Sequence, residues 1–153
     1  MIKINIVCVG SIKEKFFEDA VKEYSKRLSK FCKLQIVEVE EESKQQNIEK
    51  KIQIESERLK NACKGFVILL DRCKQEVSSE DLSFMLDSLK NVGTSEISFV
   101  IGGSNGVSEE FKKQANKCVS FGKITFPHQL FRVVLLEQIY RAFTISAGLP
   151  YHK

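Results

Sequence analysis

The stretch ISFVIGGSNG, residues 97–106, decides the fold class of this chain. Its first five residues carry no charge and are mostly apolar, which is typical of a strand covered on both faces. The strand runs directly into a glycine-rich turn, residues 102–106, whose three glycines allow close approach of the backbone to a ligand. A covered strand that ends in such a turn predicts a parallel sheet flanked by helices.

The same alternation of elements continues on both sides of this stretch. Apolar runs predict further strands over residues 2–9, 34–39, 66–70 and 118–126. Helical spacing of apolar residues predicts helices over 14–31, 48–63 and 79–89, a short one from Ser108, and a long one over 128–147. Ser79 is the expected N-cap of the third. We expect an α/β fold in which a single domain, residues 1–153, holds a mainly parallel sheet with helices on both faces.

Composition is typical of a soluble globular protein. Apolar residues make up 42% of the 153 positions and charged residues 29%, which argues against disorder. No apolar stretch approaches the roughly 20 residues that a membrane helix requires. The first ten residues, MIKINIVCVG, lack the features of a signal peptide. We expect a cytoplasmic protein that does not associate with membranes.

Neither cysteine nor histidine predicts a metal site. The five cysteines form no C-x-x-C pair, and there are only two histidines, His128 and His152. Four of the cysteines stand in or beside apolar runs, where a free thiol acts as a small apolar group.

Charge is distributed unevenly along the chain. Residues 1–33 carry a net charge of +4 and residues 111–153 carry +6, whereas residues 34–71 carry −2 and residues 72–110 carry −4. Two basic ends around an acidic middle favour a face that attracts a polyanion. An ordinary solvated surface explains the count equally well, so both interpretations stay open.

Candidate ligand contacts follow the predicted strands. Ligands of open α/β sheets bind at the carboxyl ends of the strands, which here are Leu70-Asp71, the glycine-rich turn and Thr125-Phe126-Pro127. The turn is neither a P-loop nor a dinucleotide fingerprint. By spacing alone, a tight turn without a ligand is at least as good an interpretation.

The long helix, residues 128–147, is apolar around nearly its whole circumference, so it must be buried in the core or at a subunit interface. We favour an interface in a homodimer. Its residues Glu137 and Arg141 have the spacing of an intrahelical ion pair, although Arg141 could equally serve a site. The tail Pro150-Tyr151-His152-Lys153 could fray, or its aromatic ring, imidazole and ammonium group could bind a flipped base and its phosphate.

Three segments resemble the RlmH family of bacterial ribosomal RNA methyltransferases, which belongs to the SPOUT class. They are GGSNG (102–106), SFGKITFPHQLFRVVLLEQIYRAF (120–143) and GLPYHK (148–153). The opening IKINIVCVGSIKEKF is also similar to the start of the family, so the resemblance covers nearly the whole chain. It implies a C-terminal trefoil knot and a homodimer. The implied activity is methyl transfer from S-adenosylmethionine to N3 of a pseudouridine, in the helix 69 loop of 23S rRNA within the assembled ribosome.

The resemblance also implies roles for individual residues. Cofactor contacts would come from Leu70, Gly102, Phe121, Gly122, Lys123, Ile124, Thr125 and Phe126. The target base would be surrounded by Arg132, Arg141, Tyr151 and His152. We expect Arg141, or Arg132, to stabilise the deprotonated ring, and His152 to accept or relay its proton. Gly122 departs from the family, in which many members carry serine at this position.

Two other functions compete with this prediction. A regulatory module could hold a nucleotide at the glycine-rich turn without catalysing a reaction, although the C-terminal Tyr-His-Lys group favours an enzyme. A thiol-dependent enzyme would need a cysteine beside a candidate histidine, and the sequence places none there.

Overall fold

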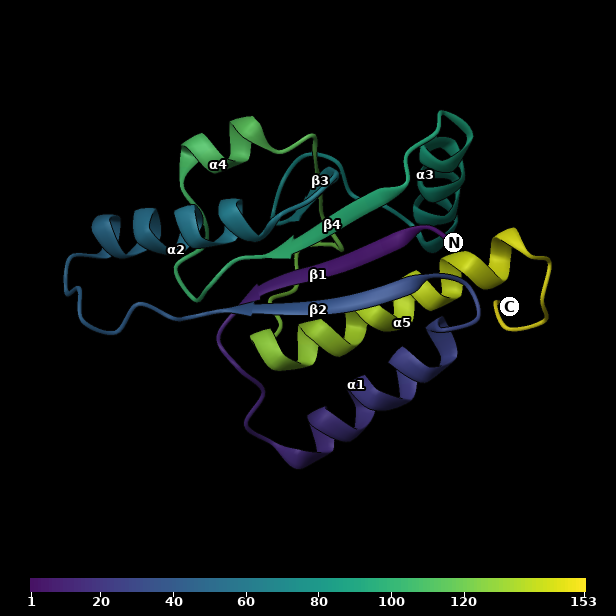
Figure 1. The fold of residues 1–153 in the computed structure, drawn as a ribbon, viewed down its shortest axis with the longest axis horizontal. Helices are drawn as coiled ribbons and strands as arrows, with labels where there is room; N and C mark the ends of the chain where they lie inside the picture. The colour runs from purple at the N-terminus through teal and green to yellow at the C-terminus, as the bar shows by residue number, and fades with distance from the viewer.

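Strands and helices alternate along residues 1–153 of the computed structural model, which describes the whole chain (Figure 1). The elements are β1 (Lys3–Val9), α1 (Lys15–Leu28), β2 (Lys33–Val39), α2 (Ile48–Ala62), β3 (Phe66–Leu70), α3 (Ser79–Asn91), β4 (Glu96–Ile101), α4 (Glu109–Gln114), β5 (Lys117–Val119) and α5 (His128–Ser146). Each predicted strand and helix is present, and most boundaries agree within three residues. None of the helices has the length and apolar character that crossing a membrane requires.

All strand pairs in the single sheet are parallel, in the order β2-β1-β4-β3-β5. Ile6 of β1, for example, pairs with Ile36 of β2 on one side and with Phe99 of β4 on the other. Parallel strands need long crossover connections, and helices supply them here. The predicted parallel sheet is therefore confirmed.

Helices cover both faces of the sheet, as predicted. Alternate side chains of each strand point to opposite faces, so β1 contributes Ile6 to one core and Val7 to the other. The larger core lies between the sheet and α1, α3 and α5, and the smaller core lies under α2 and α4. Figure 1 shows α2 and α4 on one side of the sheet and α1 and α5 on the other.

Helix α5 is central to the larger core. Leu135, Leu136 and Ile139 are fully buried between the sheet, α1 and α3. This burial accounts for much of the apolar circumference that the sequence shows. Apolar surface nevertheless remains near the start of the helix, where Leu130 is exposed and Val134 is half-buried.

Two boundaries differ from the predictions. The last strand was expected over residues 118–126 but spans Lys117–Val119. Ser120 adds only an isolated bridge to Glu76, and Gly122, with a φ of +111°, prevents an extended strand from continuing to residue 126. The N-cap of α3 is Ser78 instead of Ser79: its hydroxyl accepts from the Asp81 N–H at 3.0 Å, and the Asp81 carboxylate accepts from the Ser78 N–H at 2.8 Å. This reciprocal pair is a capping box, which requires a spacing of three residues.

Candidate functional site

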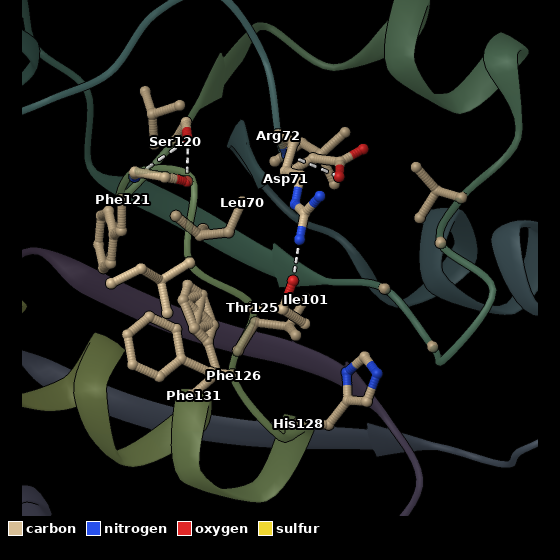
Figure 2. Close-up of a pocket in the computed structure, with 18 residues that line it drawn as sticks. Leu70, Asp71, Arg72, Ile101, Ser120, Phe121, Thr125, Phe126, His128 and Phe131 are labelled. Atoms are coloured by element: carbon tan, nitrogen blue, oxygen red, sulfur yellow. Dashed lines mark hydrogen bonds between the residues drawn. The ribbon is translucent and has the colours of Figure 1, made fainter.

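A pocket with a cavity volume of about 150 Å³ opens at the carboxyl ends of β3, β4 and β5 (Figure 2). This is the edge at which parallel α/β sheets bind ligands. Nine of its 18 lining residues are hydrophobic, and the lining includes few charged residues, among them Asp71 and Arg72. This lining is typical of a site for a small organic molecule, since such sites are mainly apolar with a few polar groups.

Seven of the eight residues expected to contact the cofactor line this pocket. They are Leu70, Gly102, Phe121, Gly122, Ile124, Thr125 and Phe126. The eighth, Lys123, is exposed and does not line it. Three segments that are far apart in the sequence thus meet in one cavity, although their binding of a cofactor stays a prediction.

At Gly102 the glycine-rich turn lies so close to its neighbours that a side chain is excluded. A Cβ atom on Gly102 would lie 2.9 Å from Val107 Cγ1 and 3.2 Å from the carbonyl carbon of Gly106. The turn is closed by the Gly106 N–H, which donates to the Gly103 carbonyl at 2.9 Å. Gly106 has a φ of +82°, a conformation that favours glycine. The turn therefore presents bare backbone to the pocket.

A loop without regular structure, residues 121–127, forms the opposite wall. The Gly122 N–H donates to Ser120 Oγ, and this hydroxyl donates to the Gly122 carbonyl, both at 3.1 Å. Serine at position 122 would be strained by the positive φ, so glycine suits this chain. The main-chain N–H and C=O groups of residues 123–126 form no hydrogen bond within the chain. They are free to bind a ligand.

Sequence reasoning missed several lining residues. Phe131 of α5 packs against Phe121 and Phe126, with ring centroids 5.5 Å and 5.7 Å apart, and completes an aromatic wall. Arg72 donates to the Thr125 hydroxyl across the opening, and His128 also lines the pocket (Figure 2). Each of these residues directly adjoins or closely follows a predicted contact, so proximity in sequence was the available signal.

The second predicted group, Arg141, Tyr151 and His152, is assembled on α5. The Arg141 guanidinium donates to the Glu137 carboxylate at 2.6 Å and lies 4.8 Å from the centre of the Tyr151 ring. The Tyr151 hydroxyl donates to the same carboxylate at 3.1 Å. The intrahelical ion pair is therefore present, and it also helps to organise the tail, which folds back onto the helix.

His152 is held through both ring nitrogens. Its Nδ1 lies 3.1 Å from Arg141 Nη1, and its Nε2 lies 2.7 Å from Glu80 Oε1. Because arginine can only donate, Nδ1 acts as the acceptor and Nε2 carries the proton that Glu80 accepts. The hydrogen bond from His152 is the main cause that lowers the pKa of Glu80. The neutral imidazole thus has its lone pair occupied in this arrangement.

Arg132 lies apart from that group. It is only 2% exposed, and its guanidinium lies 2.5 Å from a Glu38 carboxylate oxygen and 3.0 Å from the Gly10 carbonyl. It fastens α5 to the carboxyl ends of β1 and β2. That Arg132 faces a target base stays a prediction: within one chain its guanidinium is buried against these partners and does not line the pocket.

Arg141, Tyr151 and His152 form what we call the tail group. The pocket and the tail group do not meet within one chain. None of Arg141, Tyr151 and His152 lines the pocket. Arg141 follows Phe131 by ten residues, which is roughly 15 Å along the helix axis. In Figure 1 the carboxyl terminus lies near the last turns of α5, while the first turn lies near the arrowheads of the strands. Side chains in one chain cannot span this separation.

Comparison with known families supplies the deciding observation. The family described as "Predicted SPOUT methyltransferase" matches residues 2–152. The chain belongs to the SPOUT methyltransferase family. A protein of Clostridium botulinum (strain Kyoto / Type A2) named ribosomal RNA large subunit methyltransferase H is 50% identical, over 98% of this chain and 99% of that protein. A protein of the same name from Fusobacterium nucleatum is 47% identical, again over 98% and 99% of the two chains. The resemblance to the RlmH family is thus confirmed.

Solved structures show that the fold is shared with other methylases. A probable methylase family protein from Haemophilus influenzae has a TM-score of 0.57 at 11% identity, over 98% of this SPOUT methyltransferase and 70% of that chain. A putative methylase family protein from Neisseria gonorrhoeae has a TM-score of 0.51 at 13% identity, over 90% and 81%. The trefoil knot stays a prediction.

We predict that four of the five cysteines of this SPOUT methyltransferase resist alkylation near neutral pH. Burial raises the pKa of the Cys8 and Cys63 thiols to about 11, and of Cys32 and Cys118 to about 12. The reactive thiolate forms only as the pH rises through these values. Brief treatment with iodoacetamide at about pH 7 should leave these four unmodified by peptide mass spectrometry. Rapid labelling of any of the four would reopen a thiol-dependent mechanism.

Proposed function

We propose that this SPOUT methyltransferase transfers a methyl group from S-adenosylmethionine to ribosomal RNA. The proposed acceptor is N3 of a pseudouridine in the helix 69 loop of 23S rRNA, within the assembled ribosome. One observation carries the proposal: over 98% of its length, the chain is 47–50% identical in sequence to proteins named ribosomal RNA large subunit methyltransferase H. Action on assembled ribosomes implies work in the cytoplasm, which we propose as its location.

The residues of the pocket fit S-adenosylmethionine. The aromatic wall of Phe121, Phe126 and Phe131 suits an adenine ring, and the free main-chain groups of residues 123–126 suit its polar edge. The donor supplies an electrophilic methyl group on a sulfonium. Asp71 and Arg72 line the same pocket and suit the ammonium and carboxylate of its amino-acid end.

A complete site requires a second copy of the chain. Methyl transfer needs the reacting atoms within roughly 3–3.5 Å, whereas the tail group lies far from the pocket of its own chain. We propose a homodimer through α5 in which the tail group of one subunit faces the pocket of the other. Ile124 is 75% exposed at the pocket, and Leu130 is exposed on the adjacent turn of α5. Exposed apolar side chains beside a pocket support a partner surface there.

The tail group would prepare the acceptor. N3 of a uracil-type ring carries a proton and becomes a good nucleophile only after losing it. The Arg141 guanidinium would stabilise the negative charge that develops on the ring oxygens. Nδ1 of His152, now bonded to Arg141, would be free to accept the proton once Arg141 turns to the ring. Tyr151 would pack against the base.

A methylation assay tests the function and separates it from the alternatives. Ribosomes from a strain that lacks this activity should accept one labelled methyl group each, at the helix 69 loop, when mixed with the protein and S-adenosylmethionine. Binding of the donor without transfer to ribosomes would instead support a regulatory module. An unchanged turnover and pH profile in His152→Ala would refute the imidazole role.

We predict that exposed lysines near the carboxyl end of α1, from its last turn to the first residue of β2, contribute to ribosome binding. Lys26, Lys30 and Lys33 are exposed and form no ion pair. Replacing all three with glutamine should weaken binding and lower the slope of log affinity against log salt by up to about three, since each phosphate contact contributes about one. The measurement is filter binding over a salt series.

The matched control uses two lysines within α1 that already have partners. Lys15 pairs with Asp19 and Lys22 with Glu18. Replacing these two should change the slope less per residue, because their charge is partly neutralised. Equal effects per residue in the two variants would assign the attraction to overall charge instead of this end of α1.

A further inference from the structure

Glu55 of α2 is a buried carboxylate to which the proposed reaction assigns no role. It is 1% exposed and lies beside the glycine-rich turn. Its Oε2 accepts from the main-chain N–H of Glu42 at 3.0 Å. Its Oε1 is buried and has no hydrogen-bond partner, the one such side-chain atom in the structure. Leaving a buried polar atom without a partner is unfavourable to folding, so stability alone does not explain this residue.

The unpartnered oxygen of Glu55 faces Gly103. A Cβ atom on Gly103 would lie 2.6 Å from Oε1, which is closer than atoms in contact approach. Gly103 does not have a positive φ, so the requirement for glycine here is one of space. The carboxylate thus fills the space that a side chain would take. Gly103 itself lines the pocket and accepts the hydrogen bond that closes the turn.

The next residue of α2 contacts the other end of the same segment. Ser56 is buried, and its hydroxyl accepts from the Ser108 N–H at 2.9 Å. Two consecutive residues of one helix therefore contact Gly103, within the turn, and Ser108, just after it. A rigid helix that supports both ends of a loop restricts the positions that the loop can adopt.

We propose that Glu55 is a positioning residue for the methyl donor. It holds Gly103, and with it the glycine-rich turn, in the position that gives the pocket its shape. The inference rests on the proposed function, because it assumes that S-adenosylmethionine binds at this turn. Glu55 acts through the turn and touches neither the donor nor the RNA.

Titration calorimetry with S-adenosylmethionine tests this role. Glu55→Ala should bind the donor about tenfold more weakly, whereas Glu55→Gln, which keeps the shape, should stay within about threefold of the unmodified chain. In ribosome assays Glu55→Ala should raise KM for the donor and leave kcat nearly unchanged. Glu42→Ala is the matched control: it also removes a buried carboxylate but keeps the main-chain N–H that Glu55 accepts from, so its donor affinity should not change.

A double-mutant cycle tests the contact with Gly103. Gly103→Ala alone should weaken donor binding about tenfold, because the new methyl group displaces the carboxylate or the turn. Combined with Glu55→Ala, the loss should be much smaller than the product of the two, since the space is then free. If Glu55→Ala does not fold, Glu55→Asp can replace it in the cycle. The aspartate side chain is one methylene shorter and leaves room for the new methyl group, so the double variant with Gly103→Ala should regain part of the lost donor binding.

Two results would overturn the inference. The first is equal donor affinity in Glu55→Ala and the unmodified chain. The second is a double variant whose loss of donor affinity equals the product of the losses in the two single variants. Failure of the unmodified chain to bind S-adenosylmethionine is a different result, because it would contradict the proposed function itself.

Discussion

Gly102→Val should abolish binding of S-adenosylmethionine while the domain stays folded. A single Cβ atom at this position would already lie 2.9 Å from Val107 Cγ1, and two further methyl groups cannot be placed without moving the turn. The turn lies at the surface of the pocket and not in either core, so its displacement should leave the sheet intact. We expect donor affinity to fall by more than about a hundredfold in calorimetry.

The control for this substitution is Ser104→Ala. Ser104 lies in the same turn but is exposed and does not line the pocket, so donor affinity should stay near that of the unmodified chain. Circular dichroism and thermal unfolding show whether both variants are folded. A folded Gly102→Val that binds the donor normally would remove the glycine-rich turn from the binding site.

The second large effect concerns two inactive chains that together regain activity. Gly102→Val should lose the pocket but keep the tail group, and Arg141→Ala should lose the tail group but keep the pocket. In a symmetric dimer, a mixed pair contains one site with both parts intact. Random mixing gives half mixed dimers, so activity should return from near zero to about a quarter of the unmodified level.

The measurement is methylation of ribosomes after the two chains are unfolded and refolded together, or expressed together. Mixing Gly102→Val with a chain that carries both substitutions is the control, because no dimer then contains an intact pocket. Absence of recovery in the first mixture, with dimers shown to form by native mass spectrometry, would place both parts of the site in one chain.

The fold could be predicted from local patterns of apolar residues in the sequence. The covered runs at residues 66–70 and 97–101 identify buried parallel strands because both of their faces must be apolar. The strand ends then indicate the edge at which the pocket lies, so Leu70 and Gly102 could be placed in it before any coordinates were known. These inferences need only neighbours in sequence and the rules of one sheet.

What could not be predicted depends on contacts between distant segments. Arg132 reads as a free cation within an apolar helix, and only the folded chain brings Glu38 beside it. Glu55 reads as an ordinary charge on an amphipathic helix, although it is buried against Gly103. The separation of the pocket from the tail group follows from the length of α5, which the sequence does show, but its importance is clear only once the tail is located.

The free backbone of residues 123–126 has a consequence for how such enzymes can be recognised. Polar recognition there would come from amide and carbonyl groups, which every amino acid other than proline supplies in the same way. For these main-chain contacts, the amino-acid identities at residues 123–126 therefore carry little information about the ligand. Screens that replace one side chain at a time would not detect these main-chain contacts, whereas loss of the glycine at 122 would change the path of the loop and disturb them.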